Sequence, residues 1–174
     1  MSKSAPKPSH DYSEFMQRAY AMELEASERY AQFAEQMDGH NNREVAELFR
    51  KLSGIEALHA KRILEEMRWP SLPALPPAYA WEGPEGPETA PFESVHYLMQ
   101  PYHALEIALA CELQAQKYFE SIAAGRVPEK VRITAREMAQ EEREHVMLIR
   151  AWLENVPQPA AGWDEDPDPP RANE

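Results

Sequence analysis

Residues 22–35 read MELEASERYAQFAE and align without gaps to residues 111–124, which read CELQAQKYFESIAA. The two segments share Glu, Leu and two Ala residues at equivalent positions. Farther along each half, Glu56-Ala-Leu-His59 corresponds to Glu142-Arg-Glu-His145. An internal repeat predicts two copies of one supersecondary unit. Each copy carries a lone glutamate, followed later in the chain by a Glu-x-x-His motif.

The hydrophobic pattern predicts four helices, over residues 11–37, 42–68, 101–125 and 128–154. In each range apolar residues recur at alternating spacings of three and four, which is typical of a helix packed into a bundle. The second helix is expected to begin after Asn41 or Asn42, because both are suitable N-cap residues. Two antiparallel hairpins therefore form the expected fold, which is an all-α, up-down four-helix bundle.

Three segments lie outside the predicted helices. Residues 69–92 contain too many prolines for a helix and are unusually long for a connection. We interpret them as a long crossover that returns along the bundle before the third helix begins. Residues 1–10 are predicted to be disordered, residues 11–156 to form the bundle domain, and residues 157–174 to form an acidic, Pro-rich tail without regular structure.

Glutamate and histidine occupy inward positions of these helices, where a bundle normally places apolar residues. Residues i and i+3 share one helix face, so each Glu-x-x-His motif converges on one point. One such motif alone is a weak signal, but two at equivalent positions of a repeat favour a metal site. Burying four carboxylates is costly unless cations compensate their charge. The predicted ligands of two metal ions are Glu23, Glu56, His59, Glu112, Glu142 and His145.

The residue types indicate which metals this site would bind. Carboxylate and imidazole ligands without thiolate suit iron or manganese and, less specifically, zinc. We expect Glu56 and Glu142 to bridge the two ions. Glu23 with His59 would complete one position, and Glu112 with His145 the other.

These motifs resemble the rubrerythrin branch of the ferritin-like superfamily over about residues 11–154. The resemblance is carried by Glu23-x-x-Ala26-x-x-x-Tyr30, by Glu56-Ala-Leu-His59-Ala-Lys-Arg and by Glu141-Glu142-Arg-Glu-His145. It implies a ferritin-like bundle with a non-haem di-iron centre that reacts with hydrogen peroxide or dioxygen. It also implies a homodimer.

The sequence departs from the typical rubrerythrin pattern in two ways. Typical members carry a rubredoxin module with four cysteines, whereas this sequence has only Cys111, so we expect an external electron donor. They also carry a further carboxylate one turn after the third-helix glutamate, where this chain has Ala115. The remaining six ligands are closer to the ferroxidase centre of bacterioferritin. However, Ala57 stands where bacterioferritin would place its haem-binding Met, so no haem is expected.

Three functions are compatible with this reading. The first is an oxidoreductase that reduces peroxide or dioxygen, the second is a ferroxidase that passes iron to storage, and the third is a helical scaffold that binds a partner. Tyr30 lies two turns after Glu23 on the inward face. It is a candidate catalytic residue that would hydrogen-bond a ligand carboxylate or relay electrons, with simple packing as the alternative.

Composition excludes other classes of function. The formal net charge of −12 argues against binding to nucleic acids or to anionic membranes. The single Cys111 excludes an internal disulfide bond, which indicates a reducing compartment. The polar N-terminus resembles no signal peptide, and no apolar stretch reaches the roughly 18 residues of a membrane span. We therefore expect a cytoplasmic protein.

Overall fold

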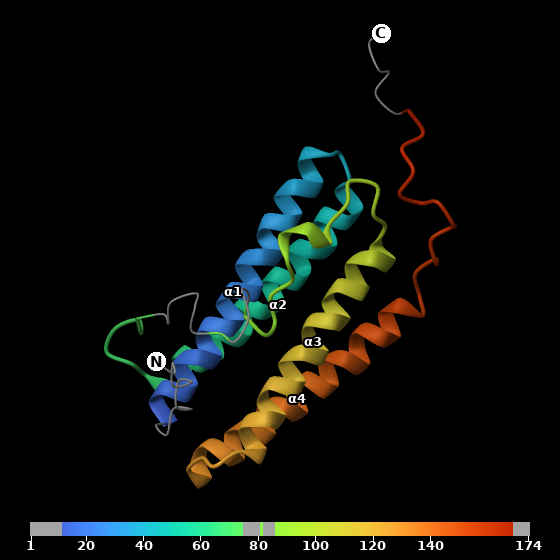
Figure 1. Cartoon of the computed structure of the whole chain (residues 1–174). Coiled ribbons are helices and arrows are strands. Elements are labelled where there is room, and N and C mark those ends of the chain that lie inside the picture. The colour runs from blue at the N-terminus through green and yellow to red at the C-terminus, as the bar shows by residue number, and fades with distance from the viewer. Residues whose placement is uncertain (1–11, 75–80, 82–85, 169–174) are drawn as a thin grey trace, which may run out of the picture.

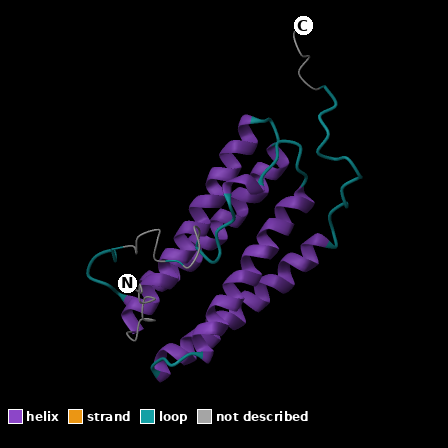
Figure 2. Ribbon diagram, in the orientation of Figure 1, coloured by secondary structure: helices purple, strands orange, loops and turns teal. Residues whose placement is uncertain are grey.

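The computed structural model describes residues 12–74, 81 and 86–168. These residues form four α-helices and one short 3-10 helix, and no strand occurs among them (Figure 2). The elements are α1 (Tyr12–Gly39), α2 (Arg43–Met67), η2 (Phe92–Ser94), α3 (Pro101–Ala124) and α4 (Glu129–Leu153). The predicted all-α fold is confirmed, and each predicted helix end lies within two residues of the observed one.

Local sequence signals explain several of these helix ends. α3 begins with Pro101, which suits the first turn because proline lacks an N–H group and has a helical φ. Before it, the backbone N–H of Gln100 donates to His103 Nδ1 over 2.9 Å, as part of a capping box. α3 ends before Gly125. These capping contacts stabilise the start of the helix that carries Glu112.

Asn42 corrects one expectation. It occupies the N-cap position of α2, but its side chain makes no capping hydrogen bond. Instead Asn42 Nδ2 donates to the backbone oxygens of Tyr97 (3.3 Å) and Met99 (2.7 Å). The side chain therefore fastens the end of the crossover to the turn between α1 and α2.

The helices form two antiparallel hairpins, and the crossover joins the end of α2 to the start of α3 (Figure 1). α1 packs mainly along α2, and α3 packs mainly along α4. α2 and α3 run in the same direction, so the chain between them must return from one end of the molecule to the other. Contacts between the hairpins are sparse by comparison.

The apolar core is divided into two clusters. One contains Phe33 and Phe49, and the other contains Phe15 and Phe119. On each helix, the predicted ligand positions fall between the residues of one cluster and those of the other. A layer of polar side chains therefore crosses the middle of the bundle, with packed apolar residues on both sides.

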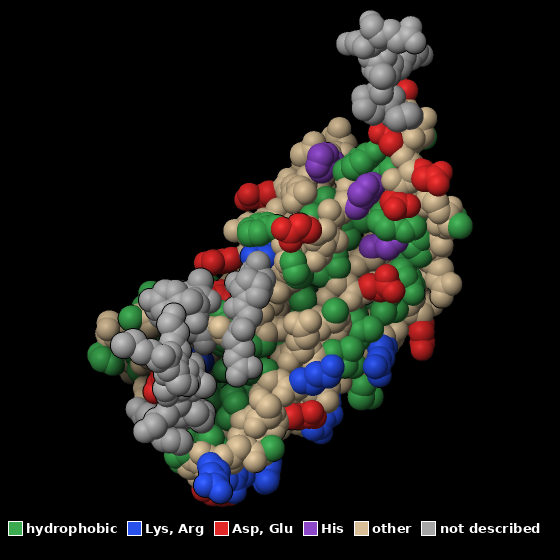
Figure 3. All heavy atoms as spheres, viewed as in Figure 1, with side chains coloured by type: hydrophobic (Ala, Val, Ile, Leu, Met, Phe, Trp, Pro, Cys, Tyr) green, Lys and Arg blue, Asp and Glu red, His purple; other side chains and the backbone are tan. Residues whose placement is uncertain are grey.

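The tail is irregular as far as the structure describes it, but it is not detached from the bundle. The ring of Trp163 lies 3.7 Å from the ring of His103 and 5.4 Å from that of His96, measured between centroids. Figure 3 shows histidine side chains gathered at this end of the molecule. The predicted disorder of residues 1–10 lies outside the described residues. Among the helices that are described, none combines the length and apolar character needed to cross a bilayer.

Candidate metal centre

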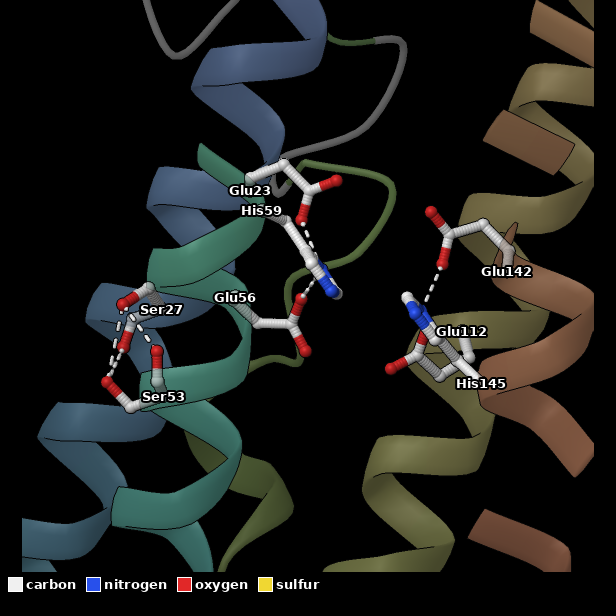
Figure 4. A network of polar contacts seen from close by, with 8 residues as sticks. All are labelled: Glu23, Ser27, Ser53, Glu56, His59, Glu112, Glu142 and His145. Atoms are coloured by element: carbon white, nitrogen blue, oxygen red, sulfur yellow. Dashed lines mark hydrogen bonds and ion pairs between the residues drawn. The ribbon is translucent and has the colours of Figure 1, made fainter. Parts of the chain in front are cut away.

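All six predicted ligand residues lie together in the middle of the bundle. α1 contributes one glutamate and α2 a glutamate and a histidine, and α3 and α4 repeat this division in the second hairpin. Figure 4 shows the two sets of side chains facing one another across the space between the hairpins. The side chains are Glu23, Glu56, His59, Glu112, Glu142 and His145.

The two sets have nearly the same geometry. His59 Nδ1 lies 3.0 Å from Glu56 Oε2 and 3.4 Å from Glu23 Oε2. His145 Nδ1 lies 3.0 Å from Glu142 Oε2 and 3.2 Å from Glu112 Oε2. In each set, one potential ligand atom per residue lies within 4.8 Å of the other two. Nδ1 is therefore the imidazole atom that faces the carboxylates in both halves.

The two histidines also define the relation between the hairpins. The rings of His59 and His145 are parallel, with an interplanar angle of 1° and a centroid distance of 4.7 Å. Each ring belongs to a different hairpin, so this contact lies between the two sets of carboxylates. The pseudo-symmetry expected from the repeat is thus present in the arrangement of the side chains.

The surroundings of the site raise the pKa values of Glu23, Glu112 and the two histidines. Removal from water raises the pKa of Glu23 and that of Glu112 to about 8. Burial alone would lower the histidine pKa values, but hydrogen bonds with the carboxylates raise the pKa of His59 to about 10 and that of His145 to about 11. Without a metal, the site therefore retains protons that compensate its negative charge.

Metal ions fit the same requirement. Glu56 Oε1 is buried and has no hydrogen-bond partner among the described residues, so at least one carboxylate oxygen is left for another ligand. Two divalent cations would neutralise four carboxylates and leave both imidazoles neutral. The clusters are compatible with a di-metal carboxylate site. The division into bridging and terminal ligands stays a prediction.

The structure adds one carboxylate that sequence reasoning missed. Glu88, on the crossover, forms a third group with Glu56 and Glu112, in which one oxygen from each lies within 4.8 Å of the others. Burial and the neighbouring carboxylates raise the pKa of Glu88 well above its ordinary value. Nothing in the sequence singles it out, because Glu82 and Glu85 stand in the same Pro-rich segment and no periodic pattern applies there.

Tyr30 lies on the inward face, as predicted. Its ring stacks on Phe49, with centroids 6.0 Å apart and planes 22° apart. Burial raises the pKa of Tyr30 well above its ordinary value, and that of the neighbouring Cys111 thiol to about 12. Within the described residues, the Tyr30 hydroxyl makes no hydrogen bond to a ligand carboxylate. Its role in electron relay stays a prediction.

Comparisons with known proteins agree with this site. A family model described as rubrerythrin matches residues 14–70, which include Glu23, Glu56 and His59. The crystal structure of an uncharacterized conserved protein from Magnetospirillum magnetotacticum MS-1 is similar, with a TM-score of 0.65 and 34% sequence identity. That match covers 86% of this chain and 98% of the Magnetospirillum protein. No curated protein matches. The chain therefore belongs to the rubrerythrin-like family of ferritin-like proteins.

Proposed function

We propose that this chain is a non-haem di-iron carboxylate oxidoreductase that reduces hydrogen peroxide or dioxygen with electrons from an external donor. One observation carries the proposal: two equivalent Glu, Glu and His sets, buried in the bundle, face each other across the hairpin interface. The rubrerythrin family favours iron over manganese or zinc. When bound, a pair of ferrous ions would supply two electrons, which suffice to reduce hydrogen peroxide to two water molecules or dioxygen to hydrogen peroxide, and the external donor would then restore the ferrous state.

The residues of the chain have three tasks in this proposal. The carboxylates bind and neutralise the cations, and the Nδ1 atoms of His59 and His145 provide one nitrogen ligand for each half. The packed apolar clusters on both sides exclude water from the site. The helices hold the side chains in place before the metal binds, which keeps the cost of reorganisation small.

The proposed function is tested by metal content and by redox chemistry together. Protein produced in iron-rich medium is expected to contain about two iron ions per chain, as in dinuclear carboxylate bundles. After anaerobic reduction, hydrogen peroxide or air should restore the visible absorption of the oxidised centre. Glu142→Gln should lose this response, whereas Glu141→Gln, at an exposed position beside it, should retain it.

Other results would support the alternative functions. Zinc alone, or only traces of redox metal, would favour the scaffold. Uptake of many iron ions per chain by a hollow assembly would favour iron handling. A dimer is incompatible with such a cage, so the native mass decides between storage and turnover.

We also propose a homodimer. Large apolar side chains are exposed on the outer faces of two helices, with Leu58 on α2 and Met147 and Leu148 on α4. Large exposed apolar side chains favour contact with another protein surface when they are part of one patch. Light scattering of the purified protein should give twice the mass of the chain, and a monomeric mass would contradict this part of the proposal.

A further inference from the structure

Glu88 is buried in the crossover with no hydrogen-bond partner among the described residues. Its side chain is only 1% exposed, and neither carboxylate oxygen has a hydrogen-bond partner in the described part of the chain. Buried polar groups are nearly always hydrogen-bonded, and a buried carboxylate is strongly unfavourable unless a proton or cation compensates it. Packing alone therefore does not explain why Glu88 is buried here.

The side chain lies between the two hairpins. One oxygen of Glu88 is within 4.8 Å of an oxygen of Glu56 on α2 and of an oxygen of Glu112 on α3. These two residues are predicted ligands from different halves of the site. Glu56 Oε1 also lacks a hydrogen-bond partner among the described residues. Three unsatisfied carboxylate oxygens thus belong to one small group.

The backbone before Glu88 is held closely against α1. A turn over residues 86–89 is closed by a hydrogen bond from Thr89 N to Gly86 O, 3.0 Å long. A Cβ atom at Gly86 would lie 2.5 Å from Glu25 Oε2, so a larger residue at this position would displace the Glu25 carboxylate. The same Glu25 carboxylate accepts hydrogen bonds from Trp81 Nε1 over 3.1 and 3.2 Å.

The backbone after Glu88 is held by the next turn of α1. The buried Arg29 guanidinium donates a hydrogen bond to the backbone oxygen of Ala90. It also lies over the ring of Phe92, 3.6 Å from the centroid. Helix α1 therefore fixes the crossover on both sides of Glu88, at two points one helical turn apart. A side chain held in this way is preorganised for a ligand.

We propose that Glu88 is a seventh ligand of the metal centre, supplied by the crossover to the space between Glu56 and Glu112. This inference rests on the proposed di-metal site. With Glu88 the centre contains five carboxylates. When ionised, these carboxylates carry five negative charges. Two divalent cations would compensate four of these charges, whereas two trivalent cations would compensate all five. Glu88 therefore favours the oxidised state, and its neutral variant should have a higher reduction potential.

Metal titrations of four proteins test the assignment. Mn²⁺ in air, and Fe²⁺ without oxygen, are titrated calorimetrically into the wild type, Glu88→Gln, Glu88→Asp and Glu93→Gln. Glu88→Gln should bind at least one ion about tenfold or more weakly. Glu88→Asp should also lose affinity, because the shorter side chain withdraws the carboxylate while keeping its charge. Glu93→Gln, at an exposed position of the same crossover, should bind like the wild type.

Two further measurements separate a ligand from a residue needed only for folding. Without metal, Glu88→Gln should melt at no lower temperature than the wild type, since the change removes a buried unpaired carboxylate. The rise in melting temperature on adding Mn²⁺ should be smaller in the variant. Mn²⁺ should also slow chymotrypsin cleavage after Phe92, which is 51% exposed, in the wild type but much less in Glu88→Gln.

The outcomes are distinguishable. Wild-type affinity in Glu88→Gln would overturn the assignment of Glu88 as a ligand. Weak binding by Glu88→Gln with full affinity in Glu88→Asp would overturn it too, because charge alone would then explain the effect. Failure of the wild type to bind any metal would instead overturn the proposed function, and this inference with it.

Discussion

The two hairpins carry the same ligands in different surroundings. In both, the histidine Nδ1 lies 3.0 Å from the oxygen of the glutamate three residues earlier. The residues around the ligands differ: Tyr30, two turns after Glu23, corresponds to Phe119, two turns after Glu112. Helix spacing thus keeps the ligand geometry alike, while the neighbouring positions are free to differ because they do not touch the proposed metal.

The first hairpin is also more polar near the site. Ser27 Oγ donates to Ser53 O over 2.9 Å, and Ser53 Oγ donates to Ser27 O over 2.8 Å, which joins α1 to α2. The equivalent residues of the second hairpin are Gln116 and Ala139, and Gln116 bonds within its own helix to Glu120. The six predicted ligands are therefore arranged alike in the two hairpins, while the contacts that support them are not.

The largest expected effect tests the predicted ligands, which are arranged alike in the two hairpins. Glu56→Ala and Glu142→Ala should each abolish metal binding at both positions, because each carboxylate is predicted to bridge. Elemental analysis of the purified variants measures this loss. Glu141→Ala, at an exposed position of α4, is the matched control. Retention of two metals per chain in either variant would refute the bridging assignment.

Replacing one histidine should lower the affinity of mainly one of the two metal positions. His59→Ala is expected to weaken one metal position by roughly 10- to 100-fold while leaving the other closer to its original affinity. His145→Ala should give the converse pattern. Stepwise titration with Fe²⁺ under anaerobic conditions, followed by spectroscopy, resolves the two positions. Equal weakening of both positions by His59→Ala would contradict the assignment of one imidazole to each ion.

The pH dependence of stability tests the charge of the metal-free site. The pKa values of Glu23 and Glu112 are about 8 in the folded protein and near 4.5 when the chain is unfolded. Between these values the folded state binds more protons, so its stability should fall as pH rises from about 4.5 to 8. The raised pKa values of His59 and His145 act in the same direction: their contribution is present below about 6.5 and is lost as pH rises through 10 to 11.

Urea unfolding at several pH values, with a chelator or with Mn²⁺, measures this effect. The decline should be clear with the chelator and much weaker with Mn²⁺, because the cations replace the protons. Glu23→Gln and Glu112→Gln should each reduce the decline by a similar amount. A metal-free protein whose stability rises over this pH range would contradict the described electrostatics.

Tyr30→Phe tests the difference between the hairpins, because the second hairpin has Phe119 at the position equivalent to Tyr30. Metal content should be unchanged, and stability should stay within roughly 0.5 kcal/mol, because the buried hydroxyl makes no hydrogen bond to a ligand carboxylate within the described residues. If Tyr30 relays electrons, reduction of the oxidised centre should slow several-fold. Tyr20→Phe, on the same helix, is the control. An unchanged rate would assign Tyr30 to packing alone.

The smallest effect concerns the serine contacts. Ser27→Ala should lower the free energy of unfolding by about 1 kcal/mol, because it removes a hydrogen bond between α1 and α2. Gln116→Ala should cost only a few tenths of a kcal/mol, as for an i,i+4 pair on one helix. Urea unfolding of the metal-free proteins compares the two. Equal effects would contradict the difference in support between the hairpins.

Prediction succeeded where residues act through a repeated local pattern. The helix ends near Gly39 and Pro101 follow from capping and backbone preferences. Glu23 and Glu112 were recognisable because a charged residue on an apolar stripe departs from the pattern around it. The side-chain contacts of Asn42 and Trp163 were not predictable, because they depend on where the crossover and the tail lie in space.

By itself, the sequence determined the four helices, their pairing into two hairpins and the six side chains of the predicted centre. The physical reason is that helical periodicity converts spacing along the chain into a shared face. Only the tertiary structure decided that Glu88 joins this group and that the two histidine rings lie parallel. An irregular crossover has no period, so the position of its side chains is set by long-range contacts such as those of Glu25 and Arg29.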